Sequence, residues 1–200
     1  MDKKTINKWE KITENCLQHN RQFMQICNSF SRGFLGELLV FNQLLKTYGK
    51  NISKPENGIL FYGSSKKGHD IELKLGERKI YINAKATTMH DKNGQPYWVR
   101  QHARNFAKIE TKSGKTYIKP RKDYKKDFYY VYVDLKKWED KGITDFYALS
   151  DTDAKKLFGP KYQRERRKKG FKIRNNDSDD FWIEYTDIKQ FKDNKIKKIK

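Results

Sequence analysis

The sequence predicts an α/β protein in which a mixed β-sheet is flanked by helices and preceded by an N-terminal helical extension. Apolar residues recur at spacings of three and four over the first part of the chain, as they do in amphipathic helices. Short runs rich in aromatic and β-branched residues follow, and the later runs alternate with helical patterns. We expect a single domain over residues 1–200, with an N-terminal helix at 1–31, a motif-bearing core at 32–135, and strand–helix elements with a basic tail at 136–200.

Two helices are expected first. The pattern of the first covers residues 5–30, and the tripeptide Ser-Arg-Gly at 31–33 interrupts it. The second covers 33–49 and ends at its last glycine, since glycine commonly follows the end of a helix. A loop at 50–58 precedes a short strand at 59–62.

The middle of the chain holds the strands of the core. Strands at 70–75 and 79–88 are joined across Gly-Glu-Arg and are expected to form a hairpin. Residues 97–110 are expected to be helical or irregular, and 111–127 to form a basic loop. The run Phe-Tyr-Tyr-Val-Tyr-Val within 127–135 predicts a strand, because aromatic and β-branched residues suit a pleated, buried surface.

The C-terminal part alternates strands and helices. A strand at 144–150 leads into a helix, because Ser150 and Asp153 have the spacing of a capping box. A strand at 181–185 and a short helix at 187–191 are expected to follow.

The chain is strongly basic. Its 45 lysine and arginine residues oppose 25 aspartate and glutamate residues, which gives a formal net charge of +20. This surplus favours a polyanionic partner, with nucleic acid first and an anionic membrane second. A solvated, lysine-rich surface with no such partner is the alternative. We expect phosphate contacts from the densest basic stretch, which contains Arg164, Arg166, Arg167, Lys168, Lys169 and Lys172.

The sequence predicts a cytoplasmic protein. No apolar run approaches the ~18 residues of a membrane-spanning helix, and the N-terminal residues lack the apolar region of a signal peptide. Cys16 and Cys27 have neither metal-binding nor redox spacing. The four histidines also lack ligand spacing, so zinc is not expected, and we interpret His69 as an incidental loop residue.

A polar row on the strand at 79–88 is the first candidate for chemistry. Successive side chains of a strand point to opposite faces, so Asn83 and Lys85 share one face and Ala84 and Ala86 share the other. The alanine face is expected to pack closely on a helix. A lysine on a largely buried strand requires a nearby anion.

Two acidic residues are candidates for that anion. Asp70 opens the preceding strand and is expected roughly level with Lys85 across the hairpin. Glu37 lies in an apolar row of the second helix, so it is expected at the rim of a groove or beside a partner. A buried ion-pair cluster without chemistry is one interpretation. Two carboxylates and a lysine are also what metal-assisted hydrolysis of a phosphodiester requires.

The order of these residues resembles the PD-(D/E)XK nuclease superfamily. The matching motifs are Gly36-Glu37 in a helix, Gly68-His69-Asp70-Ile71, and a strand containing Asn83-Ala84-Lys85. They span residues 33–88, and the later strand–helix order matches loosely. The resemblance implies a restriction-endonuclease-like fold and a Mg²⁺-dependent endodeoxyribonuclease, with Mn²⁺ as an alternative ion. It also implies DNA as substrate and, by analogy with double-strand cutters, a homodimer.

The resemblance assigns roles to individual residues. It makes Asp70 the principal metal-binding carboxylate, Lys85 the catalytic lysine and Glu37 a helix acid that holds the metal or its water. It makes the backbone carbonyl of Ala84 a further metal ligand, with Asn83 at the remaining motif position.

Asn83 departs from the family pattern, which places an acidic residue or glutamine there. An amide oxygen still coordinates Mg²⁺ but contributes no charge. A non-catalytic nucleic-acid-binding protein on a degenerate nuclease scaffold is therefore the alternative function, and an RNA-directed protein is a third.

Glu72 and Lys74 also have E-x-K spacing, but they lie on the same strand as Asp70, whereas a metal site normally draws its acids from two strands.

Residues after the second motif strand are expected to line a nucleic-acid groove. These are Trp98, Arg100 and Gln101, which combine an aromatic ring with donors for phosphate or base edges.

Overall fold

The computed structural model describes the helical N-terminal part, the central sheet and several shorter segments of the 200-residue chain. The described residues are 2–22, 29–62, 69–90, 92–94, 96, 101–102, 106–110, 116–120, 127–150, 152–153, 180–181 and 192. For residues 20–22, 29–31, 101–102, 106–110, 116–120 and 180–181 the description is of the backbone.

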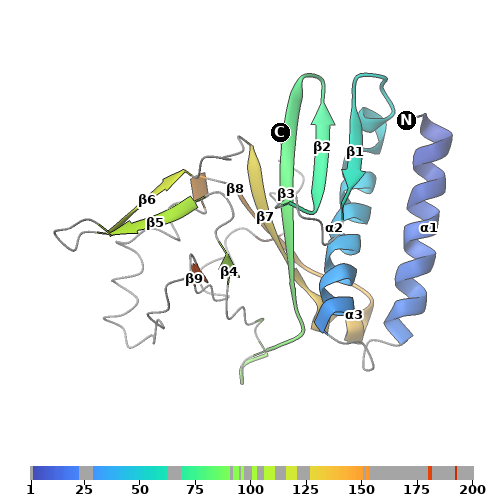
Figure 1. Ribbon diagram of the computed structural model, residues 1–200. Coiled ribbons are helices and arrows are strands. Elements are labelled where there is room, and N and C mark those ends of the chain that lie inside the picture. The colour runs from blue at the N-terminus through green and yellow to red at the C-terminus, as the bar shows by residue number, and fades with distance from the viewer. Residues whose placement is uncertain are drawn as a thin grey trace.

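Two long helices precede a mixed five-stranded sheet, so the α/β class is confirmed (Figure 1). The elements are α1 (Lys3–Gln22), α2 (Ser29–Ile52), β1 (Gly58–Phe61), β2 (Ile71–Leu75), β3 (Arg78–Thr87), β4 (Gln101–His102), β5 (Phe106–Glu110), β6 (Thr116–Pro120), β7 (Phe128–Asp134), α3 (Leu135–Lys141), β8 (Phe146–Ser150) and β9 (Asp180–Phe181). The sheet has the order β1-β2-β3-β7-β8, in which β3 and β7 run parallel and the other neighbours run antiparallel. The pairs β4–β9 and β5–β6 form two small antiparallel sheets.

The hairpin β2–β3 forms as the sequence predicts. Leu75 pairs with Arg78, so two residues make the turn, and Gly76 takes a positive φ of 63°. Glycine adopts this conformation without the steric penalty of a side chain. The register that this turn sets continues to Ile71 opposite Ile82.

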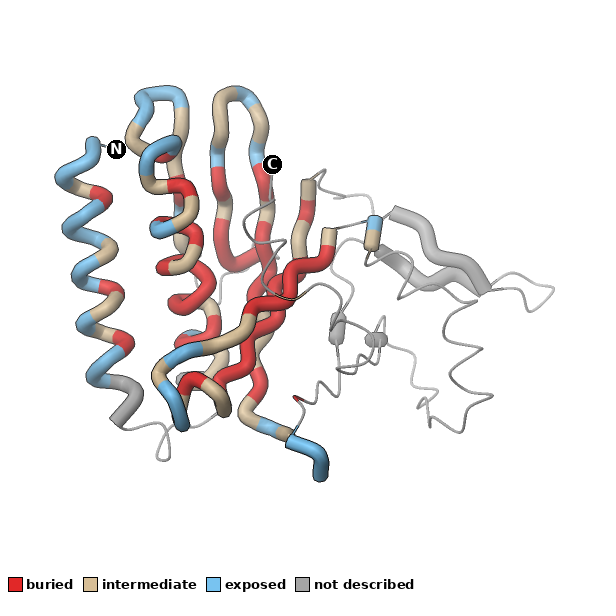
Figure 2. Tube along the Cα trace, turned by 180° about the vertical axis from the view of Figure 1, so that it is seen from behind, coloured by how far each residue is buried: buried red, intermediate tan, exposed pale blue. Residues whose placement is uncertain are grey.

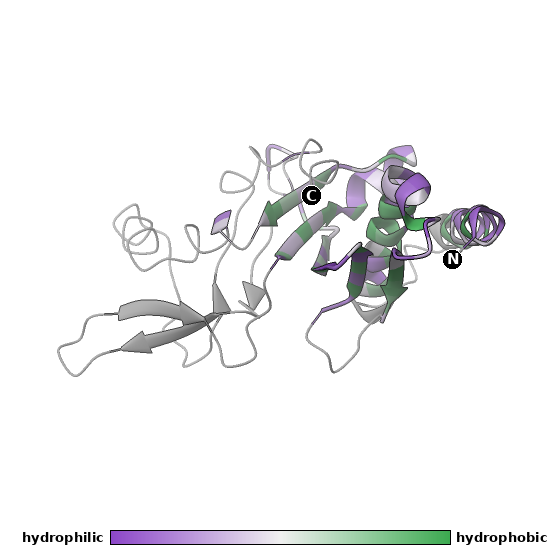
Figure 3. Cartoon of the chain, turned by 90° about the horizontal axis from the view of Figure 1, so that it is seen from above, coloured by the Kyte–Doolittle hydropathy of each residue, from purple (hydrophilic) through white to green (hydrophobic). Residues whose placement is uncertain are grey.

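The main core lies between α2 and one face of the sheet, which we call the inner face. Ile71, Leu73, Ile80, Ile82 and Ala84 of the hairpin are buried there together with apolar residues of α2. Buried residues concentrate where α2 and the sheet face each other (Figure 2). Viewed from above, hydrophobic residues gather in the same layer, and hydrophilic residues dominate α1 (Figure 3).

The opposite, outer face of the sheet is also largely buried around its central strands. By alternation, Asn83 and Lys85 of β3 share this face with Tyr130 and Tyr132 of β7. Tyr130 and Tyr132 are fully buried and Asn83 is nearly so, while Lys85 is half-buried. The predicted separation of an apolar face from a polar face on β3 is therefore confirmed.

The predicted break between the N-terminal helices is wrong in position. α1 ends at Gln22, and α2 begins at Ser29 and continues through Gly33 to Ile52. A glycine inside a helix costs about 1 kcal/mol relative to alanine. Burial of the following residues, including Leu35 and Val40, outweighs that cost.

Two predictions in the middle of the chain are also wrong. Residues 106–110, expected to be helical or irregular, pair as β5 with β6 at 116–120, where a loop was expected. Each of these segments is only five residues long and contains one lysine, so the two-residue period of a strand is too short to recognise. Helix α3 was not predicted either, although Asp134 caps its start with Oδ1 accepting from the Lys137 N–H (3.0 Å), and Gly142 follows its end.

Local signals at the C-terminal end of the sheet were interpreted correctly. The Asp153 N–H donates to Ser150 Oγ (3.2 Å), which is one half of the predicted capping box, and Ser150 Oγ donates to Asp153 Oδ2 (2.8 Å). β9 pairs Phe181 with Gln101 of β4. The rest of the strand predicted at 181–185 and the helix predicted at 187–191 lie outside the described residues.

None of the helices in the described part of the chain is both long and apolar enough to cross a bilayer.

Candidate functional site

Helix α2 places Glu37 beside the sheet because Gly36 allows an unusually close approach. A Cβ atom built on Gly36 would overlap the Cβ of Ala86 on β3. Contact of this kind requires glycine on the helix and a small residue on the strand. The predicted close packing of the alanine face on a helix is thus confirmed, and it brings the next residue, Glu37, to the sheet.

Asp70 lies at the point where β2 begins, with its carboxylate in the plane of the sheet. Its Oδ2 atom accepts a hydrogen bond of 2.7 Å from the backbone N–H of Ala84, and its own N–H donates to the Ile82 carbonyl (2.9 Å). The carboxylate therefore occupies the place beside β3 that a further residue of β2 would fill. Asp70 is buried at this position.

The register corrects one detail of the prediction. Asp70 lies beside Ile82 and Ala84, and not level with Lys85. Lys85 is one residue beyond Ala84 on β3 and opposite Tyr132 of β7, on the outer face. Three charged side chains thus converge at the start of β2. Glu37 comes from the helix side, Asp70 lies in the plane of the sheet, and Lys85 comes from the outer face.

The electrostatics of Glu37 report this convergence. Its carboxyl pKa is raised from 4.5 to about 7, first by burial and then by the negative charge of Asp70, while the positive charge of Lys85 acts to lower it. Charges act on one another in this way only when they share a poorly solvated region. The structure therefore brings together the three charged residues that the sequence singled out.

Two buried oxygen atoms near the meeting point accept no hydrogen bond from the residues that the structure describes. They are Glu37 Oε2 and Asn83 Oδ1. A buried oxygen without a donor is costly, and such atoms mark places where a water molecule or a cation completes the structure.

The oxygen donors present fit a hard divalent cation such as Mg²⁺. The site offers the carboxylates of Glu37 and Asp70 and the amide oxygen of Asn83. The N–H and C=O of one strand residue point to the same side, so the Ala84 carbonyl is directed toward the β2 side, as its N–H is. Within the described residues no group of three or more His, Cys, Asp or Glu side chains could hold a metal ion, so a cation at this place would depend also on the neutral oxygens of Asn83 and Ala84.

His69 was wrongly interpreted as an incidental loop residue. It is 3% exposed, and its ring meets the rings of Tyr62 and Tyr81 edge-on at centroid distances of 5.1 and 4.9 Å. Its Nε2 lies 3.9 Å from Glu72 Oε2. Nothing in the sequence beyond its position before Asp70 indicates this packing, because the contacts come from Tyr62, which follows β1, and from Tyr81 of β3.

A second polar pair lies at the ends of β3 and β7. His90 Nε2 is 2.9 Å from Oδ1 of the buried Asp134, which is level with Thr87 in the register of the two strands. The same Asp134 oxygen caps α3, so this carboxylate joins the chain after β3 to the start of the helix. We assign the pair a structural role.

The predicted nucleic-acid contacts fall beyond what the structure describes. Residues 164, 166, 167, 168, 169 and 172 of the basic stretch lie outside the described residues, as do Trp98 and Arg100. Gln101 is described as backbone in β4. Their roles stay predictions.

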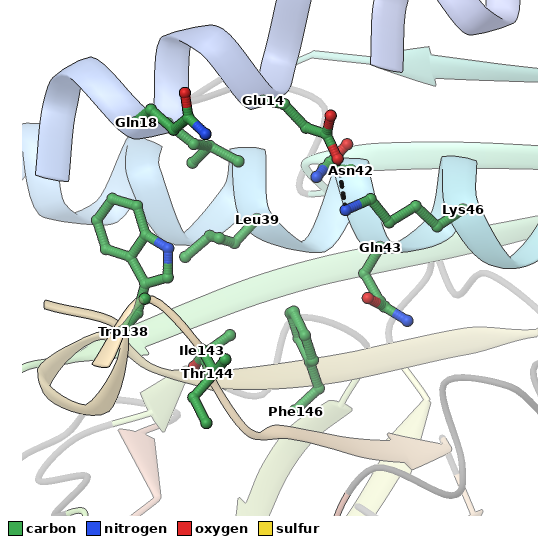
Figure 4. A pocket seen from close by; sticks show the side chains of 12 residues that line it. Glu14, Gln18, Leu39, Asn42, Gln43, Lys46, Trp138, Ile143, Thr144 and Phe146 are labelled. Carbon is green, nitrogen blue, oxygen red and sulfur yellow. Dashed lines mark ion pairs between the residues drawn. The ribbon is translucent and has the colours of Figure 1, made fainter. Parts of the chain in front are cut away.

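A separate groove lies between the two long helices and the segment around α3 (Figure 4). It encloses about 520 Å³, and the Glu14–Lys46 ion pair (2.6 Å) lies along it. Residues of α1, α2 and 138–146 line it, and none of Glu37, Asp70, Asn83 and Lys85 does. The groove is therefore distinct from the candidate site.

Comparison with known proteins assigns the chain to no family. No family model and no curated protein matches the sequence. Among solved structures, the chain is similar to the bacterial homing endonuclease I-Ssp6803I, with a TM-score of 0.37 and 12% sequence identity over 62% of this chain and 70% of that one. A likeness of this size establishes no membership in a nuclease family.

Proposed function

We propose that the protein is a metal-dependent DNA endonuclease that hydrolyses phosphodiester bonds at the site formed by Glu37, Asp70, Asn83 and Lys85. The observation that supports this most is the convergence of Glu37, Asp70 and Lys85 beside β3. The Gly36–Ala86 contact brings Glu37 to the strand, the Ala84 N–H holds Asp70 there, and the pKa of Glu37 is raised first by burial and then by Asp70, and is lowered by Lys85. Two acids and one lysine that share a poorly solvated site in a chain of net charge +20 suit a polyanionic substrate.

The carboxylates of Glu37 and Asp70, the Asn83 amide oxygen and the Ala84 carbonyl would hold Mg²⁺ or Mn²⁺. When bound, such an ion supplies Lewis acidity toward a phosphate oxygen and makes a coordinated water more acidic. The chain's own contribution is geometric. The Ala84 N–H fixes the Asp70 carboxylate, and the Gly36–Ala86 contact fixes the height of Glu37 above the strand.

Lys85 provides the positive charge of the site. Its ammonium group would orient the attacking water or stabilise the negative charge that develops on the phosphate during in-line attack. Because Lys85 lies on the outer face and Glu37 on the helix side of β3, the substrate would approach from the outer face.

The test is cleavage of supercoiled plasmid and of branched DNA by purified protein with Mg²⁺ or Mn²⁺. Wild type should nick or cut at least one substrate, EDTA should abolish the reaction, and Asp70→Ala and Lys85→Ala should each be inactive. Equal activity in all three proteins would refute the proposal. Circular dichroism and Tm on each variant separate loss of catalysis from loss of fold.

A second function is favoured by one specific observation, the neutral side chain at position 83. With Asn83 the donor set carries only the two negative charges of Glu37 and Asp70, which weakens cation binding. The alternative is a nucleic-acid-binding protein on the same scaffold that does not cut. It predicts salt-dependent binding without cleavage in wild type, and stronger Mg²⁺ binding by Asn83→Glu in calorimetry.

A further inference from the structure

Two lysines face each other directly across the hairpin. Lys74 of β2 is paired with Lys79 of β3, and both are exposed. Directly opposed residues of an antiparallel pair have Cβ atoms ~5 Å apart, so like charges at these positions repel. A cross-strand lysine pair therefore disfavours the hairpin that contains it unless an anion lies between the two ammonium groups.

The protein itself neutralises only part of this charge. Lys79 Nζ lies 3.3 Å from Glu72 Oε1, and the Lys79 side chain remains 54% exposed. Lys74 has no carboxylate partner in the described part of the chain. The pair thus keeps a net positive charge directed at solvent.

The lysine pair lies on the same face of the sheet as Lys85 of the candidate site. Side chains at every second residue share a face, so Glu72 and Lys74 of β2 align along the outer face, with Lys79 and Lys85 of β3 on the same face. Four residues of strand separate Asp70 from Lys74, a distance of ~13 Å. The ~3.4 Å axial rise per nucleotide is less than the distance between successive phosphates, because the backbone winds around the axis, so ~13 Å spans at most about four nucleotides of one DNA strand.

We propose that Lys74 and Lys79 bind a backbone phosphate of the nucleic acid within about four nucleotides of the reacting phosphodiester. The phosphate would lie between the two ammonium groups and remove their repulsion. This inference rests on the proposed function for its partner, since it takes the polyanion to be nucleic acid. It places the substrate strand along the outer face of β2 and β3, over residues to which the sequence assigned no contact.

The experiment is fluorescence anisotropy of a labelled DNA duplex titrated with full-length protein in EDTA over a series of salt concentrations. The test variant is Lys74→Gln with Lys79→Gln. The matched control is Lys8→Gln with Lys11→Gln, which makes the same change in net charge on exposed residues of α1, and α1 packs on α2 rather than on the outer face. We expect about tenfold weaker binding for the hairpin variant and a salt slope reduced by about 2, against little change for the control.

The single variant Lys74→Gln keeps the Lys79–Glu72 ion pair, so it separates a loss of DNA binding from a loss of folding. It should reduce the salt slope by about 1 while its Tm stays unchanged or rises, because the repulsion is gone. Equal losses in the hairpin and control variants, or no loss in either hairpin variant, would overturn the inference. Because binding is measured in EDTA, it does not depend on cleavage, so a wild type that binds through the hairpin but does not cut DNA with Mg²⁺ or Mn²⁺ would refute the nuclease and leave this inference standing.

Discussion

The carboxylate of Asp70 is held in the plane of the sheet by the backbone N–H of Ala84, at 2.7 Å. The N–H that a neighbouring strand would have satisfied is instead satisfied by a side chain, so the start of β2 and the middle of β3 are joined through a charged group. Hydrogen bonds to charged groups are stronger than those between neutral groups. The Asp70 carboxylate held by this contact adds to the effect of burial in raising the pKa of Glu37.

Two substitutions of Asp70 should separate its contribution to stability from its proposed role in DNA cleavage. Asp70→Asn keeps an oxygen that can accept from Ala84, so we expect a loss of stability below about 1 kcal/mol but loss of DNA cleavage by at least about a hundredfold. Asp70→Ala leaves the buried N–H without a partner and should cost about 1 to 3 kcal/mol. Urea denaturation and plasmid cleavage measure the two effects, and full activity in Asp70→Asn would contradict the assigned role.

Gly36 should be intolerant of any side chain. In Gly36→Ala the new methyl group overlaps Ala86, so α2 must move away from β3, at a cost of about 1 to 3 kcal/mol. Glu37 moves with the helix, so activity should fall as well. Both losses should be reduced when Gly36→Ala is combined with Ala86→Gly, which removes the overlapping atom.

Gly33 provides the control on the same helix. A Cβ atom there meets nothing within 4 Å, so Gly33→Ala should stabilise the protein by up to about 1 kcal/mol through helix propensity alone. In chemical denaturation, the free energy of unfolding should therefore fall in Gly36→Ala and rise in Gly33→Ala, each relative to wild type. Equal destabilisation would show that the contact with Ala86 is not what sets the requirement for glycine.

Local patterns predicted the parts of the fold that depend on nearby residues. The hairpin, the two faces of β3 and the Ser150 cap follow from alternation, turn residues and spacing within a few positions. The start of α2 and the burial of His69 did not follow, because contacts with distant elements decide them. For the site, the sequence identified the residue types of Glu37, Asp70 and Lys85, but the in-plane position of Asp70 depends on the exact start of β2.

The bidentate salt bridge between Arg78 and Asp127 should contribute measurably but modestly to the free energy of unfolding. Arg78 donates from Nε and a terminal nitrogen to the two carboxylate oxygens (2.8 and 2.6 Å), and Asp127 adopts a positive φ of 54° just before β7. Both side chains are about one-third exposed, so solvent screens the pair. A double-mutant cycle with Arg78→Ala and Asp127→Ala should give a coupling of about 0.5 to 1 kcal/mol that weakens in 1 M salt. A coupling that is unchanged by salt would contradict a charge-based contribution.

Glu37 should make the stability of the metal-free protein depend on pH. Its pKa is raised in the folded state from 4.5 to about 7, so between these values the unfolded chain releases a proton that the folded protein retains. Folding stability therefore falls as pH rises from about 4.5 to 7 and is level above and below this window. Relative to Glu37→Gln, wild type should lose about 1 to 2 kcal/mol across it, allowing for solvent screening of a half-buried group.

Urea denaturation of both proteins in EDTA at several pH values measures this difference. Asp70→Asn removes the second of the two causes that raise the pKa of Glu37. The pH-dependent difference in stability between Asp70→Asn and the double variant Asp70→Asn with Glu37→Gln should therefore be smaller than the difference between wild type and Glu37→Gln. Added Mg²⁺ should reduce the loss in wild type at pH 7, because a bound cation favours the ionised carboxylate. A wild type whose stability relative to Glu37→Gln is constant from pH 4.5 to 7 would show that Glu37 and Asp70 do not share a desolvated site, and the proposed donor set would lose its basis.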